Sequence, residues 1–104
     1  MKTIFLVTVI SEQHTRNQRT WGWFPNFEEA EKAVLSNATD MFECNYYNLA
    51  VIEEVESGLI AHVVQEKWYK AVYPAFNGEN CFNPQVSEIP KPKCFEYTVN
   101  FGMG

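Results

Sequence analysis

The sequence lacks the residue patterns of the common catalytic sites. It contains no glycine-rich phosphate loop, no dinucleotide-binding fingerprint, no His-Glu pair at metalloprotease spacing and no nucleophile elbow. Its two histidines, His14 and His62, fall in different predicted elements. We therefore predict no catalytic residue, no metal ligand and no cofactor, and this absence favours a protein that is not an enzyme.

Cysteine and long apolar runs are also scarce. The three cysteines, Cys44, Cys81 and Cys94, are an odd number at wide spacings, which fits neither a disulfide framework nor a metal knuckle. The first ten residues are too short an apolar run for a spanning helix of about 20 residues, and they lack the cleavage site of a signal peptide. The sequence therefore predicts a cytoplasmic protein with no membrane partner.

Positively charged residues are also few. Eight Lys and Arg residues stand against 13 Asp and Glu residues, which gives a net charge of −5. Between Glu28 and Glu66 there are nine acidic residues and only Lys32 to oppose them. Such a surface repels a nucleic-acid backbone, so we expect no binding to duplex DNA, whereas an acidic face can attract a basic protein.

The length of 104 residues and the lack of a linker predict a single domain over residues 1–104. The segment Lys2–Ile10 is rich in β-branched residues and apolar on both faces, as expected for a central strand. Asn26 is a predicted helix N-cap, with Glu29 three residues later as in a capping box. Apolar residues then recur at three and four positions, which predicts a helix over residues 27–42.

Strand patterns follow the helix in four segments: residues 48–55, 59–64, 67–73 and 95–101. The wholly polar residues 11–20 predict an exposed loop or a hairpin extension, and the proline-rich residues 74–93 predict a surface loop. The predicted fold class is α+β, with an antiparallel or mixed sheet of four to five strands and one main helix packed on one face.

The segment Arg16–Pro25 has the most unusual composition. Two arginines are followed by two tryptophans, with a glycine between the indoles. Guanidinium groups pair bidentately with phosphate and aromatic faces stack on bases, so the segment suits a planar, anionic ligand such as a nucleotide. In the alternative interpretation the indoles pack the helix onto the sheet and the arginines pair with the acidic face.

A second aromatic wall for such a ligand is predicted at Trp68 and Tyr69, with the same alternative of core packing. The predicted ligand-binding residues are therefore Arg16, Arg19, Trp21, Trp23, Trp68 and Tyr69.

Five runs along the chain carry a resemblance: Arg19–Pro25, Phe27–Glu31, Val51–Val55, Trp68–Lys70 and Asn100–Gly104. With these runs the chain resembles a group of short proteins encoded by gut bacteria, their prophages and related phages. The resemblance covers most of the chain in the same order, although the loop over residues 74–94 is longer here. It supplies no established activity and carries over no functional residue. It implies the host cytoplasm as location if a phage encodes the chain, and stoichiometric binding, by analogy with small acidic phage proteins.

Three functions stay open at this point. The first is a non-enzymatic binding protein of phage or prophage type that acts against a host defence system, by sequestering a nucleotide-like signal or by inhibiting a host protein. The second is a small nuclease or phosphodiesterase that uses His14, Arg16 or Arg19 with a carboxylate. The third is a plain protein-interaction module, with a homo-oligomer formed through a free sheet edge.

Overall fold

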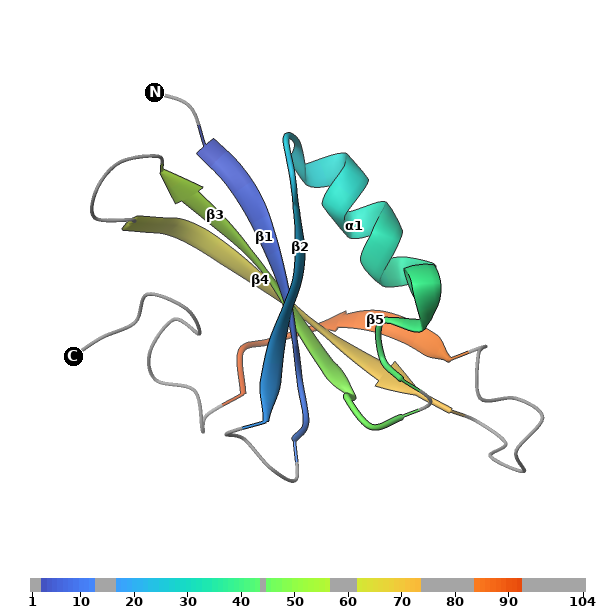
Figure 1. The fold of residues 1–104 in the computed structure, drawn as a ribbon. Helices are drawn as coiled ribbons and strands as arrows, with labels where there is room; N and C mark the ends of the chain where they lie inside the picture. Colours follow the sequence, from blue (N-terminus) through green and yellow to red (C-terminus); the bar gives the residue numbers. More distant parts are fainter. Residues whose placement is uncertain (1–2, 13–16, 44, 57–61, 74–83, 93–104) are drawn as a thin grey trace.

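The computed structural model describes residues 3–12, 17–43, 45–56, 62–73 and 84–92. Within these ranges the chain forms a five-stranded antiparallel sheet with one α-helix packed against one face (Figure 1), which confirms the predicted α+β fold class. No helix in this part of the chain has the length and apolar character needed to cross a membrane.

The elements follow the chain in this order: β1 (Thr3–Ile10), β2 (Gln18–Phe24), α1 (Phe27–Leu35), the 3-10 turn η1 (Ala38–Asp40), β3 (Leu49–Glu56), β4 (His62–Val72) and β5 (Gln85–Ile89). In the sheet the order is β2-β1-β3-β4-β5, and all neighbouring strands are antiparallel. Among the described strands, β2 and β5 therefore form the two edges.

The central strand β1 is buried on both faces over its second half, from Val7 to Ile10. It pairs with β3 over its whole length, from the Thr3–Glu56 pair to the Ile10–Leu49 pair. Because side chains alternate along a strand, Val7 and Val9 join the core beneath α1, whereas Ile10 joins a second buried cluster on the opposite face. We term these two sides the helix face and the far face. The far-face cluster consists of Ile10, Leu49, Val51 and Trp68.

The start of the helix is confirmed. The Asn26 side chain accepts a hydrogen bond from the Glu29 amide at 2.9 Å, with the extended backbone of an N-cap residue. Ala30 and Val34, four residues apart, are fully buried against the sheet.

The predicted helix end at residue 42 is wrong, because α1 stops at Leu35. Asn37 adopts a left-handed conformation with φ 51°, and its side chain accepts a hydrogen bond from the Phe42 amide at 3.1 Å. Asparagine tolerates this conformation better than most residues, and its side chain competes with the helical hydrogen bonds. Met41 and Phe42 are still buried, so the apolar spacing is satisfied by the η1 turn and not by further helix.

Both edge strands include residues outside the predicted strands: residues 11–20 are predicted as an exposed loop or a hairpin extension, and residues 74–93 as a surface loop. β2 begins at Gln18, inside the polar segment 11–20, and β5 lies inside the proline-rich segment 74–93. Edge strands pair on one side only and carry little apolar pattern, so their pairing depends on the strand beside them. Pro84 and Pro90 flank β5, which fits the confinement of proline to strand ends and edges.

Two further predictions concern the C-terminal half. The segments predicted as separate strands over residues 59–64 and 67–73 contribute to one strand, β4, over residues 62–72. The strand predicted over residues 95–101 lies outside the described residues.

A polar contact fastens α1 to the sheet. The Tyr69 hydroxyl donates a hydrogen bond to Glu31 Oε2 at 2.6 Å, and Lys67 Nζ lies 3.4 Å from the same oxygen. Burial of the phenol, together with its hydrogen bond to Glu31, raises the pKa of Tyr69 above its ordinary value. The helix is thus held by a carboxylate that accepts hydrogen bonds from two residues on the same face of β4.

Removal of the helix cap should destabilise the fold by a modest amount. In Asn26→Ala the Glu29 amide loses its acceptor, and we expect the free energy of unfolding to fall by about 1 kcal/mol, measured by urea denaturation. Asn26→Asp keeps a side-chain acceptor at the same position and should retain the stability of the natural protein. An unchanged midpoint in Asn26→Ala would contradict this role for the cap.

Tyr69 should make the stability fall at alkaline pH. Since its pKa is higher in the folded chain than in the unfolded chain, its contribution is complete below about pH 10 and is lost as the pH rises towards the folded-state pKa. The thermal midpoint of the natural protein should therefore fall more steeply above about pH 10 than that of Tyr69→Phe. Tyr46→Phe, at an exposed tyrosine, controls for the loss of a hydroxyl group. Equal slopes for the natural protein and Tyr69→Phe would rule this contribution out.

Candidate functional site

Two of the predicted ligand-binding residues line one hollow. Arg19 and Trp21 of β2 form one wall of a cavity of about 330 Å³. The facing wall comes from the turn after α1, through Thr39, Asp40, Met41 and Glu43. We term this cavity the Arg19 hollow.

The two walls of the Arg19 hollow are joined by an exposed polar contact. Arg19 Nη1 lies 3.2 Å from Glu43 Oε2, and these side chains are 63% and 44% exposed. Outside the lining of the hollow, Asn17 Nδ2 donates a hydrogen bond to the Tyr46 hydroxyl at 3.0 Å. Exposed ion pairs contribute about 0–1 kcal/mol, so a ligand can replace the Arg19–Glu43 contact at little cost.

A β-bulge interrupts β2 at Trp21. Val7 of β1 pairs with Gly22 and Thr8 pairs with Thr20, so Trp21 is an extra residue with no partner in the register of β1. In a regular strand, residues two apart lie on the same face. The extra residue in a bulge breaks this alternation and re-aims a side chain.

The bulge therefore separates the two indoles of the Arg/Trp segment. Trp21 packs against the helix-face core and stacks on Phe24, with 6.1 Å between ring centroids and an interplanar angle of 23°. Trp23 pairs with Leu6, two residues from the bulge, and its side chain is 61% exposed. The register thus places Trp23 on the far face, outside the Arg19 hollow.

The other predicted ligand-binding residues do not line the Arg19 hollow. Trp68 and Tyr69 are almost completely buried, on opposite faces of β4. The Trp68 indole donates to Glu66 at 3.0 Å on the far face, and Tyr69 binds Glu31 on the helix face. Arg16 lies outside the described residues.

The turn that lines the hollow contains strained backbone. Thr39, Asp40 and Glu43 all have positive φ angles, of 49°, 55° and 47°. Left-handed conformations cost non-glycine residues about 1–2 kcal/mol each, and a β-branched threonine tolerates them poorly. Such residues cluster at ligand clamps and switch regions, so the strain marks the turn as a candidate site.

The sequence analysis missed Thr39, Asp40 and Met41 because the predicted helix over residues 27–42 runs through them, and Glu43 follows directly after its predicted end. A signal was present in Ser36 and Asn37, since both residue types compete with helical hydrogen bonds and favour caps and turns. A helix end at that point would have identified Thr39 and Asp40 as turn residues.

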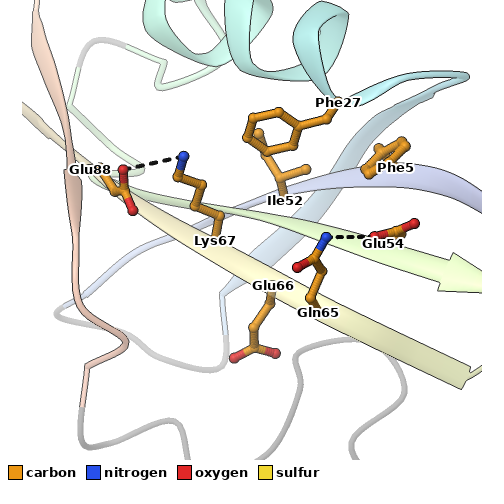
Figure 2. Close-up of a pocket in the computed structure, with 8 residues that line it drawn as sticks. All are labelled: Phe5, Phe27, Ile52, Glu54, Gln65, Glu66, Lys67 and Glu88. Carbon is orange, nitrogen blue, oxygen red and sulfur yellow. Dashed lines mark hydrogen bonds and ion pairs between the residues drawn. The ribbon is translucent and has the colours of Figure 1, made fainter.

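A larger cavity, of about 420 Å³, lies under the start of α1 (Figure 2). We term it the Lys67 groove. Three apolar residues line it, Phe5, Phe27 and Ile52, together with the side chains of Lys67 and Glu88 and a polar pair described below. Figure 2 shows Lys67 pointing towards α1, whereas its neighbour Glu66 points to the opposite side of β4. No part of this groove was predicted, because its residues come from distant elements and form no local motif.

The Lys67 ammonium is held on three sides. It lies 3.3 Å from Glu88, 3.4 Å from Glu31 and 5.0 Å from the centre of the Phe27 ring. Desolvation alone would lower the pKa of Lys67, but the hydrogen bonds and charges of Glu88 and Glu31 outweigh it, so the pKa is raised. The groove therefore already holds one cation against an aromatic face.

In the part of the chain that the structure describes, no three His, Cys, Asp or Glu residues are grouped closely enough to hold a metal ion. His14, which the nuclease hypothesis uses, lies outside that part. No protein-family model, curated protein or solved structure matches the chain, so the interpretation of the two cavities depends on their geometry.

Proposed function

We propose that this chain is a small non-enzymatic binding protein that takes a planar, anionic ligand of nucleotide type into the Arg19 hollow. The observation that carries the proposal is the convergence of a guanidinium, an indole and a strained turn on one cavity. Its volume of about 330 Å³ lies in the range of small-molecule sites.

Each wall of the hollow offers a contact suited to such a ligand. The Arg19 guanidinium supplies paired donors for a phosphate group. The half-buried Trp21 supplies an aromatic surface on which a base can stack, a contact of about 1–3 kcal/mol. Asp40 and Glu43 supply carboxylate acceptors for sugar hydroxyls on the facing wall.

Glu43 has two opposing effects on an anionic ligand. Its carboxylate neutralises Arg19 in the free protein, at 3.2 Å, and it repels a phosphate placed beside the guanidinium. Because the pair is exposed, the phosphate can displace Glu43 from Arg19 at a cost of at most about 1 kcal/mol. Removal of the Glu43 charge should therefore strengthen the binding of an anionic ligand and weaken the binding of a cationic one. A Glu43 variant thus tests the charge of the ligand.

The resemblance to phage and prophage proteins provides the biological setting of the proposal. A protein that binds a nucleotide-like signal of a host defence system removes it from solution without turnover, so it needs no catalytic group. The alternative in which the chain inhibits a host protein would use a surface and not a small cavity.

Calorimetric titration with a panel of cyclic and linear nucleotides tests the site. We expect saturable binding at one site, weakened about tenfold or more in Arg19→Ala and in Trp21→Ala, and strengthened in Glu43→Gln. Trp23→Ala is the matched control, because it removes an indole of the same strand that lies outside the hollow. No binding by any nucleotide, or equal losses in Trp21→Ala and Trp23→Ala, would refute the site. Nucleotide turnover at substoichiometric protein would refute the non-enzymatic function.

Relief of the strain in the turn should raise the stability of the fold and weaken the binding of a nucleotide. Thr39→Gly removes the Cβ that disfavours φ 49°, and we expect the free energy of unfolding to rise by about 0.5–1 kcal/mol after the greater chain entropy of glycine is subtracted. Thr39→Ala keeps a Cβ and should not gain this stability. Nucleotide affinity should fall in Thr39→Gly, since a more mobile turn must be ordered by the ligand. A stability gain of the same size in Thr39→Ala would exclude strain as the cause.

A further inference from the structure

The Lys67 groove carries more negative than positive charge. On one side Lys67 is shared between Glu31 and Glu88, at 3.4 Å and 3.3 Å, so a single ammonium faces two carboxylates. Glu88 is 58% exposed, which leaves much of its carboxylate open to solvent and to a ligand. This side of the groove alone has an excess of one negative charge.

A third carboxylate, that of Glu54, also lines the groove and has uncharged partners. Thr3 Oγ1 donates to Glu54 Oε2 at 2.9 Å, and Gln65 Nε2 donates to Glu54 Oε1 at 2.7 Å (Figure 2 shows the second contact). Each carboxylate oxygen can accept two hydrogen bonds, so both have room for a further donor. Glu54 is therefore positioned and charged, and its charge is not neutralised by either partner.

The rest of the groove is apolar. Phe5 and Phe27 meet edge to face, with 6.1 Å between their ring centroids, and both remain partly exposed beside the buried Ile52. Such a floor suits the methylene stem of a long basic side chain, which lies along apolar surface while its charged head stays at the rim. The contact of Lys67 with the Phe27 ring is an internal example of this packing.

We propose that the Lys67 groove docks an arginine-bearing basic segment of a protein partner. The guanidinium binds the two oxygens of Glu54 as a fork, and its stem packs on Phe5 and Phe27. The acidic stretch from Glu28 to Glu66, with nine acids and one lysine, attracts such a segment and steers its approach. The groove of about 420 Å³ has space for the arginine and for part of an adjacent residue. None of its lining residues belongs to the Arg19 hollow, so this inference does not depend on the nucleotide proposal.

A peptide titration tests the docking site. The probe is a fluorescent hexapeptide of alternating arginine and leucine, and its control is the same peptide with citrulline, which keeps the shape of arginine without the charge. We expect saturable binding of the arginine peptide and little binding of the citrulline peptide, by fluorescence anisotropy at low and at physiological salt. Absence of binding by the arginine peptide at both salt concentrations would overturn the proposal.

Two variants distinguish specific binding in the Lys67 groove from general attraction of a basic peptide to an acidic protein. Glu54→Gln removes one charge while its amide can still bond Thr3 and Gln65, so we expect an intact fold and binding weakened about tenfold. Glu56→Gln removes the same charge two residues along β3, outside the groove, and should leave the affinity within about twofold.

Lys67→Met should change the affinity for the arginine peptide in the opposite direction to Glu54→Gln. It retains much of the aliphatic stem and removes the Lys67 ammonium from the groove, so the arginine peptide should bind several-fold more tightly. Equal losses in Glu54→Gln and Glu56→Gln would show attraction by net charge alone and overturn the proposal. If Lys67→Met unfolds the chain, as urea denaturation will show, the comparison of Glu54→Gln with Glu56→Gln still decides.

Discussion

The antiparallel pairing of β1 with β3 is the constraint on which the rest of the structure depends. The two strands form eight consecutive pairs in the middle of the sheet, and most of β3 and the second half of β1 are buried on both faces. A shift of one residue in this register would exchange the helix face with the far face for every side chain. The pairing therefore decides that Val7 and Ile52 pack beneath α1, while Val51 belongs to the opposite cluster.

The Arg19 hollow arises where this regular pairing gives way to irregular structure. The bulge at Trp21 breaks the alternation of β2 at the edge of the sheet, and the turn after α1 replaces helix with left-handed residues. The bulge and the turn both lower the stability of the fold, because an unpaired strand residue and a positive φ are each less favourable than regular structure. They meet at the Arg19 hollow, which is why this cavity, and not the larger one, carries the proposed function.

Electrostatics distinguish the two cavities. In the Arg19 hollow one guanidinium faces two carboxylates across an exposed and replaceable ion pair. In the Lys67 groove the ammonium is fixed by Glu31 and Glu88, and Glu54 is held by neutral donors. A guanidinium in an exposed ion pair can exchange Glu43 for an anionic ligand, whereas carboxylates held by neutral donors beside aromatic rings suit a cationic ligand. The two cavities of this acidic chain thus suit ligands of opposite charge.

The sequence alone determined the elements whose signals are local. The β-branched run of β1 and the cap formed by Asn26 with Glu29 depend on neighbours in the chain, so the α+β class and the helix start were predictable. The edge strands β2 and β5 and the helix end near Asn37 were not, because strand pairing and the capture of the Phe42 amide compete with local preference only in the folded chain. Tertiary structure also decided which indole meets Arg19: two tryptophans two residues apart would share a face in a regular strand, and one bulged residue separates them.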